Sequence, residues 1–131
     1  SQPFARRGRR VVDEVLKTNV EKQDGFGVVA LEGRVVRENQ AQLRSELESL
    51  VSEGVSGIAL NLEAVTYMDS AGLGCCAAVQ RHMKTEGAGR MAVYGAAPDI
   101  RRMWELIRLD LVIPLFEEQS DALSHLKSPS D

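Results

Sequence analysis

A continuous apolar run over residues 57–62 is followed, a few residues later, by a second apolar stretch that starts at Ser70 and has the length of a helix. A strand that is apolar throughout is typical of a sheet position covered on both faces. The stretch after Ser70 is apolar nearly all round at its start, which indicates a helix that is largely buried there. The sequence therefore predicts a central strand that leads into a packed helix, with a loop over residues 63–68 between them.

The segment before this unit has the pattern of a hairpin. Residues 15–22 alternate, with Leu16, Thr18 and Val20 on one side, and the pair Asp24-Gly25 precedes a second apolar run over residues 27–31. An Asp-Gly pair between two such runs is typical of a tight turn between antiparallel strands. The start of the segment has an alternative interpretation, because four residues would also fit one face of a short helix: Val11, Val12, Val15 and Leu16.

The pattern changes to helical spacing from Asn39 onward. Four apolar residues fall on one helical stripe, and Gly54 follows them as a typical helix stop: Leu43, Leu47, Leu50 and Val51. We expect an amphipathic helix that covers one face of the sheet.

The C-terminal half continues the alternation. Residues 87–89 (Gly-Ala-Gly) end the helix that starts at Ser70, residues 91–94 form the next predicted strand, and Pro98 opens a helix at a position where its missing N–H costs least. The predicted inner face of that helix consists of Ile100, Met103, Trp104 and Ile107. Residues 112–116 are predicted as a last strand, which Pro114 confines to a sheet edge, and Ser120 is predicted to cap a final helix that carries Ala122, Leu123 and Leu126.

Strands that alternate with helices imply an α/β domain, and the opening hairpin makes its sheet mixed. We expect a single domain over residues 15–127 with four to five strands and about four helices, a basic N-terminal arm over residues 1–14 and a tail over residues 128–131. The chain begins with Ser1 and not Met, so we expect some of the arm to be foreign to the natural protein.

Charge restricts the classes of partner. The formal net charge of −3 argues against a general nucleic-acid surface. Four arginines crowd the N-terminal arm and could touch nucleic acid, an acidic partner or a membrane, although a solvated tail is the more ordinary interpretation: Arg6, Arg7, Arg9 and Arg10. No apolar run approaches the roughly 20 residues that cross a bilayer, and no secretory signal is evident, so we expect a cytoplasmic protein without membrane insertion.

Ser70 is the candidate switch residue. The first N–H groups of a helix lack intrahelical partners and lie at the positive end of the helix dipole, so a phosphate on Ser70 could be accommodated without melting the helix. Ser and Asp are also the residues that most often cap a helix start, and on local chemistry alone capping is the simpler role for Ser70 or Asp69.

The sequence offers little for catalysis. His82 and His125 have no carboxylate or thiol at the spacing of a triad or a metal site, and Met68 stands where a Gly-x-Ser-x-Gly elbow needs glycine. The segment Gly72-Leu73-Gly74 lacks a dinucleotide fingerprint, and close helix packing explains its glycines better. Cys75 and Cys76 are adjacent inside a predicted helix, where thiols usually serve packing. We expect no enzyme, no cofactor and no metal.

Three segments together resemble STAS domains, and specifically bacterial anti-sigma factor antagonists: residues 61–63 (Asn-Leu-Glu), residues 68–74 (Met-Asp-Ser-Ala-Gly-Leu-Gly) and residues 118–123. The resemblance covers roughly Gly25 to Leu126, and its most specific part is the element that begins with Asp69-Ser70. It implies that Ser70 is a phosphoacceptor and assigns a further five residues to partner contact: Asp69, Ala71, Gly72, Gly33 and Arg34.

The resemblance also implies the partners. Unphosphorylated antagonists of this kind bind an anti-sigma factor that is a serine kinase, phosphorylation releases it, and a serine phosphatase resets the switch. Two alternatives stay open with the same fold: a non-enzymatic subunit of a signalling scaffold, or one of a transporter ATPase complex. A third class is small-molecule or nucleotide binding at the start of the Ser70 helix. The sequence leaves both a monomer and a homodimer open.

Overall fold

The computed structural model describes residues 15–128, so the predicted arm and most of the predicted tail lie outside the described residues. The elements in chain order are β1 (Lys17–Gln23), β2 (Phe26–Val35), α2 (Gln40–Ser52), β3 (Gly57–Met68), α3 (Ser70–Glu86), β4 (Arg90–Tyr94), α4 (Pro98–Leu106), the 3₁₀ turn η1 (Leu109–Leu111), β5 (Leu115–Phe116) and α5 (Gln119–Lys127). The five strands form one sheet in the order β1-β2-β3-β4-β5. Only the β1–β2 pair is antiparallel, so the predicted mixed α/β sheet is confirmed.

The opening hairpin follows from its turn residues. Asp24 and Gly25 both have positive φ, 56° and 87°, which a two-residue turn needs to match the twist of its strands. Gln23 then pairs with Phe26 across the turn. The helical alternative for the start of the chain is wrong for Val15 and Leu16, which are not helical; the main chain of buried Leu16 instead exchanges two hydrogen bonds with the Gln42 side chain. Val11 and Val12 lie outside the described residues.

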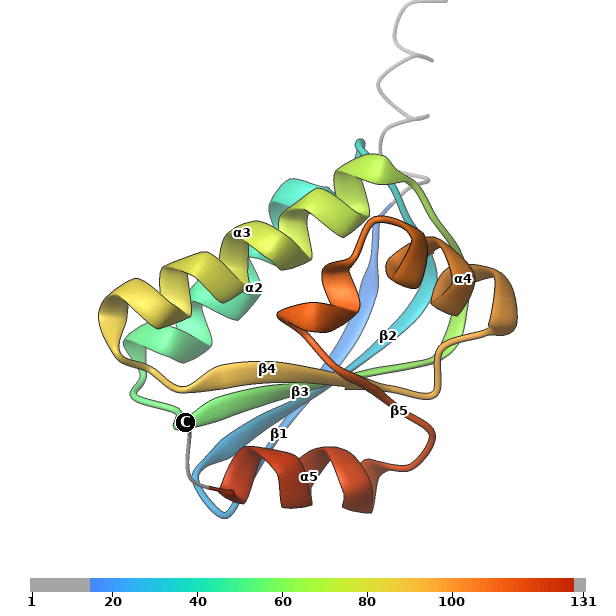
Figure 1. Cartoon of the computed structure of the whole chain (residues 1–131). Helices are drawn as coiled ribbons and strands as arrows, with labels where there is room; N and C mark the ends of the chain where they lie inside the picture. The colour runs from blue at the N-terminus through green and yellow to red at the C-terminus, as the bar shows by residue number, and fades with distance from the viewer. Residues whose placement is uncertain (1–14, 129–131) are drawn as a thin grey trace, which may run out of the picture.

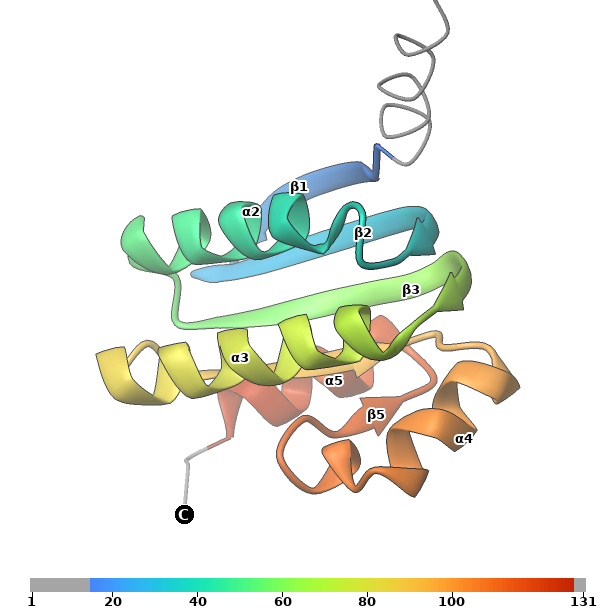
Figure 2. The same ribbon diagram turned by 90° about the horizontal axis from the view of Figure 1, so that it is seen from above.

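Helices cover both faces of the sheet. Helices α2 and α3 lie side by side on one face, and α5 covers the other (Figure 1). Seen from above, α4 lies on the side of α3 that faces away from α2 (Figure 2). The larger core lies between the sheet and α2, α3 and α4, and a smaller cluster joins α5 to Phe26, Val28, Ala59, Ala92 and Tyr94.

Strand β3 is longer than predicted, and the loop expected over residues 63–68 is wrong. The strand continues to Met68, with Leu62, Val65 and Met68 buried and the residues between them exposed. The pairing of β2 with β3 shifts register twice, between Ala30 and Glu32 and between Gly33 and Arg34. These irregularities replace the usual alternation with a three-residue spacing of buried positions, which a period-two pattern does not recognise. The extension carries the chain directly to the start of α3.

Three other predictions need correction in the C-terminal half: the inner face of α4, the length of β5 and the cap of α5. Ile100 and Trp104 of α4 are buried, but Met103 and Ile107, the residue directly after the helix, are 46% and 52% exposed. Trp104 donates its ring N–H to the carbonyl of Ile113 at 3.0 Å, which turns the other apolar residues outward. Strand β5 contains only Leu115 and Phe116, at the predicted edge of the sheet.

Ser120 does not cap α5. The helix begins at Gln119 and already includes Ser120; Glu118 takes the cap position, and its carbonyl accepts the N–H groups of Asp121 and Ala122. The buried face of α5 is as predicted: Ala122, Leu123 and Leu126.

Candidate functional site

Ser70 is the first residue of α3, and its side chain is exposed. The residue before it, Asp69, is the N-cap: its Oδ1 accepts the N–H of Gly72 at 2.9 Å. Within residues 15–128, no hydrogen bond involves the Ser70 hydroxyl. The capping role that the sequence left open for either residue therefore belongs to Asp69, and the Ser70 hydroxyl is left available at the positive end of the helix.

Asp69 also ties α3 to the loop after β2. Its Oδ2 accepts the N–H of Arg37 at 2.9 Å, and its own N–H donates to the carbonyl of Val35 at 3.1 Å. Desolvation by itself raises the pKa of Asp69, but hydrogen bonds from Gly72, Arg37 and Ala71 and the charge of Arg37 outweigh it and hold the pKa below its usual value. Asp69 is therefore a carboxylate at neutral pH.

The two glycines of the segment differ. A Cβ on Gly72 would lie 2.8 Å from Cγ of Met68 and 2.9 Å from the carbonyl oxygen of Val35, so its predicted role in close packing is confirmed. A Cβ on Gly74 would meet nothing within 4 Å, so the same prediction is wrong there. Gly72 is buried, whereas Gly74 is exposed and leaves a hollow on the surface of α3.

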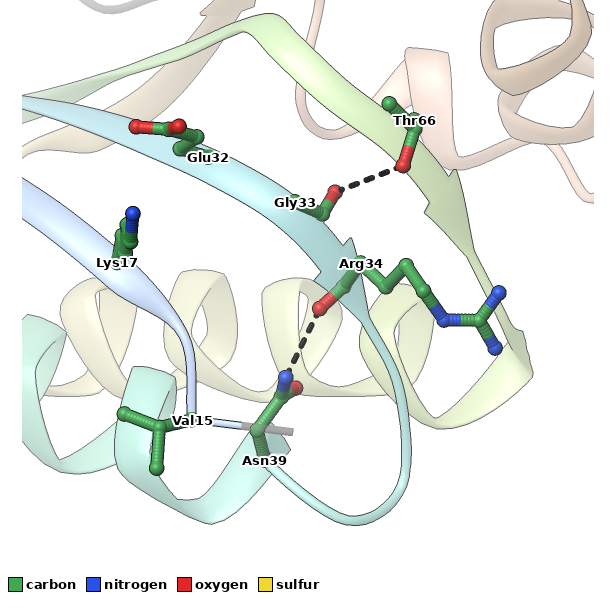
Figure 3. Close-up of a pocket in the computed structure, with 7 residues that line it drawn as sticks. All are labelled: Val15, Lys17, Glu32, Gly33, Arg34, Asn39 and Thr66. Atoms are coloured by element: carbon green, nitrogen blue, oxygen red, sulfur yellow. Dashed lines mark hydrogen bonds between the residues drawn. The ribbon is translucent and has the colours of Figure 1, made fainter. Parts of the chain in front are cut away.

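Gly33 and Arg34 line a separate hollow of about 380 Å³ at the end of β2 (Figure 3). Thr66 donates its hydroxyl to the carbonyl of Gly33 at 3.4 Å, and buried Asn39 donates to the carbonyl of Arg34 at 2.8 Å. The Arg34 side chain points away from Asn39 (Figure 3), and its guanidinium lies 4.8 Å from the centre of the Tyr67 ring. Because Tyr67 also borders the surface beside Ser70, the two regions are contiguous.

The surface beside Ser70 is a mainly apolar groove of about 440 Å³. It is lined by Tyr67, Met68, Asp69, Ser70, Leu73, Gly74, Ala77, Met103 and Ile107. Tyr67 is 47% exposed, Met103 comes from the outward side of α4, and Ile107 directly follows that helix. Sequence reasoning missed the last two because helical spacing alone placed them in the core.

The histidines and cysteines of residues 15–128 lie apart from Ser70 in the helices that the sequence predicts for them. His82 lies in α3 and His125 in α5, both half-buried, and burial together with the charge of Arg90 lowers the pKa of His125. Burial raises the pKa of the Cys75 thiol to about 11 and that of Cys76 further still. In the described part of the chain, no cluster of His, Cys, Asp and Glu side chains could hold a metal ion. Nor does any helix there have the length and apolar composition to span a membrane.

The chain is similar to known proteins in both sequence and structure. The sequence model of the STAS domain family matches residues 17–122. An anti-sigma F factor antagonist from Paenibacillus polymyxa is 26% identical over 113 residues, which cover 86% of this chain and 96% of the relative. A crystal structure of an anti-sigma factor antagonist from Mycobacterium paratuberculosis superimposes with a TM-score of 0.78 at 27% identity, covering 86% of this chain and 95% of that one.

A third similar structure is that of the Bacillus cell fate determinant SpoIIAA in its phosphorylated form. Its TM-score is 0.66 at 20% identity, covering 85% of this chain and 100% of that one. At this identity the likeness concerns the fold alone.

Proposed function

Because the chain belongs to the STAS domain family, we propose that it is an anti-sigma factor antagonist whose binding is switched off by phosphorylation of Ser70. The partner in this proposal is an anti-sigma factor that is also a serine kinase. The antagonist itself does no chemistry: it sequesters the anti-sigma factor in its unphosphorylated form and releases it when modified. A serine phosphatase restores the binding form, and the cycle takes place in the cytoplasm.

The observation that carries the proposal is that Asp69, and not Ser70, caps α3. Asp69 caps α3, so the exposed Ser70 hydroxyl can be esterified without loss of a cap. A phosphate there adds about −1.5 to −2 charges at neutral pH, and the positive end of α3 favours that charge. The fold is retained while the surface changes.

The new charge would lie at the edge of an apolar groove. A partner group packed against Tyr67, Met103 and Ile107 would have to desolvate the phosphate or move away. A loss of about 3 kcal/mol in the free energy of binding weakens affinity by roughly two orders of magnitude, which is enough to release a partner.

The other residues assigned to partner contact surround Ser70. Asp69 and Ala71 flank it along the chain, and Gly33 and Arg34 lie at the adjoining end of β2, with Arg34 stacked on Tyr67. Gly72 is buried, so its part in the proposal is to bring the start of α3 close to Val35. The names of the antagonists from Paenibacillus and Mycobacterium support the class of partner, and the phosphorylated form of SpoIIAA supports a fold that tolerates a phosphate.

The test is phosphorylation by purified kinases of the anti-sigma type from the genome that encodes this chain. With Mg-ATP, the cognate kinase should transfer one phosphate to the wild-type protein, and mass spectrometry of its peptides should place the phosphate on Ser70. Ser70→Ala should accept none and should keep its affinity for the kinase. Ser120→Ala is the matched control, because Ser120 is an exposed serine in the first turn of α5 beside Asp121, and it should be labelled like the wild type.

Persistent labelling of Ser70→Ala would contradict the site. If no such kinase binds, and affinity purification from native cells recovers a transporter ATPase or a scaffold protein, the proposed partner class is wrong.

A further inference from the structure

The hollow beside Ser70 continues along α3. A second hollow, of about 730 Å³, adjoins it and shares Ala77 as a lining residue. The part of the second hollow that lies along α3 is lined by Gln80, Arg81 and Lys84, with Val112 opposite them. We call these two adjoining hollows, which extend from Ser70 to Lys84 along α3, the α3 groove.

One face of α3 forms the floor of the α3 groove. Ser70, Gly74, Ala77, Arg81 and Lys84 recur at spacings of three and four residues, so they share one side of the helix. At about 1.5 Å per residue they span roughly 21 Å. The floor has no side chain at Gly74, where a would-be Cβ would meet open space beyond the helix's own backbone.

The opposite wall of the α3 groove is exposed apolar surface. It consists of Met103 from α4, of Ile107 directly after α4, and of Val112, which is 55% exposed. Two further large apolar side chains, Leu106 and Leu111, are exposed on the same segment. Five exposed large apolar residues between positions 103 and 112 are far more than scattered surface residues explain, and such patches mark interaction sites.

The two ends of the α3 groove differ in charge. Arg81 and Lys84 are exposed at the end far from Ser70, and neither forms an ion pair with another residue in the 15–128 range. Asp69 and the Ser70 hydroxyl lie at the near end. An occupant that is acidic at one end and apolar along its length would complement this surface.

We propose that the α3 groove seats an amphipathic helix of the anti-sigma factor, with its apolar face against Met103 and Ile107 and an acidic end against Arg81 and Lys84. This proposal rests on the proposed function, since the anti-sigma factor is its partner. The floor of the α3 groove is a helix whose backbone groups are bonded internally, so the occupant must satisfy its own backbone, as a helix does. Ser70 closes one end of the α3 groove, and a phosphate there would meet the apolar face of the bound helix.

The direct test uses a synthetic helical peptide of about 15 residues, which matches the groove length. One face carries Leu and Met at helical spacing, and one terminal turn carries two Glu. Isothermal titration of the wild-type protein should show saturable binding of one peptide per chain.

Two variants address the apolar floor. Gly74→Leu fills the hollow with a better helix former and should weaken binding at least about tenfold while the protein stays folded by circular dichroism. Gly74→Ala should give a smaller loss. Val20→Ser is the matched control outside the α3 groove, because Val20 is an exposed apolar residue of β1, and it should bind the peptide like the wild type.

A charge reversal addresses the basic end. The double variant Arg81→Glu with Lys84→Glu should bind the peptide about tenfold more weakly, and a peptide with Lys in place of the two Glu should recover the loss. The proposal is overturned if neither Gly74→Leu nor the double charge reversal weakens peptide binding. It is also overturned if the wild-type protein binds no peptide.

Measuring how the anti-sigma kinase binds and phosphorylates Gly74→Leu separates this proposal from the proposed function. If the kinase binds and phosphorylates Gly74→Leu as well as the wild type, the α3 groove is not its docking site, and the proposed switch at Ser70 is unaffected. Conversely, peptide binding with the expected charge response, in a protein that no anti-sigma kinase phosphorylates, supports the groove and contradicts the switch. A concentration-dependent dimer that Gly74→Leu abolishes in sedimentation would make a second copy of this chain the occupant and overturn the assignment to the anti-sigma factor.

Discussion

Asp69 accepts the backbone N–H of Arg37 at 2.9 Å, across 32 positions of sequence. The other oxygen of the same carboxylate caps α3 at Gly72. One side chain thus holds two segments that together surround Ser70: the loop after β2 and the first turn of the helix. The position of the candidate phosphoacceptor depends on this carboxylate, which leads to the first two predictions.

Asp69→Ala should destabilise the protein far more than Ser70→Ala. The first variant removes a helix cap and a hydrogen bond to Arg37 and should lower the free energy of unfolding by about 1–2 kcal/mol. The Ser70 side chain neither caps α3 nor forms a hydrogen bond within the described residues. Ser70→Ala should therefore change the free energy of unfolding by less than about 0.5 kcal/mol. Urea unfolding followed by circular dichroism measures both. Equal losses of unfolding free energy in the two variants would contradict the assignment of the cap to Asp69 alone.

The contribution of Asp69 should depend on pH in a known direction. Its pKa is lower in the folded protein than the usual value of about 3.9, so the stabilisation is fully present above about pH 5 and is lost as pH falls through the folded pKa. Asp69→Asn keeps a capping side chain without the charge and serves as the reference. The difference in unfolding free energy between wild type and Asp69→Asn should be constant from pH 7 to about pH 5 and should shrink at lower pH. A difference that grows on acidification would contradict the pKa assignment.

The paired variants Gly72→Ala and Gly74→Ala should have opposite effects. A methyl group on Gly72 would be forced against Met68 and Val35 and should cost about 1–3 kcal/mol. On Gly74 it meets open space, and alanine's helix preference should raise stability by about 0.5–1 kcal/mol. Thermal or urea unfolding distinguishes the two. The prediction fails if both variants change the stability of the protein in the same direction.

The two thiols should be inert in the native protein. Cys75 and Cys76 are buried, and the pKa of Cys75 is raised to about 11, so little thiolate is present at pH 8. Ellman's reagent should react slowly under native conditions and rapidly with both thiols in denaturant. The single variants Cys75→Ser and Cys76→Ser assign any residual native reaction to one position. Fast native labelling of either thiol would show that this part of α3 opens readily.

Several features of the fold were predictable from short segments. The Asp24-Gly25 turn, the helix that ends before Gly54 and the start of α3 after Asp69 all depend on local backbone preferences. The extension of β3 was not predictable in this way, because its buried residues follow register shifts against β2, which lies elsewhere in the chain. The outward position of Met103 and Ile107 was missed for a similar reason: the hydrogen bond of Trp104 to Ile113 decides which side of α4 faces the core.

At the site, local chemistry narrowed the cap to Asp69 or Ser70 and placed a hydroxyl at the start of a helix. It could do so because turn chemistry and helical periodicity act over a few neighbouring residues. Which of the two caps, which loop meets the carboxylate and what borders the hydroxyl were settled only when β2, α3 and α4 came together. Those outcomes depend on contacts between distant segments, as between Asp69 and Arg37, and no local pattern records such contacts.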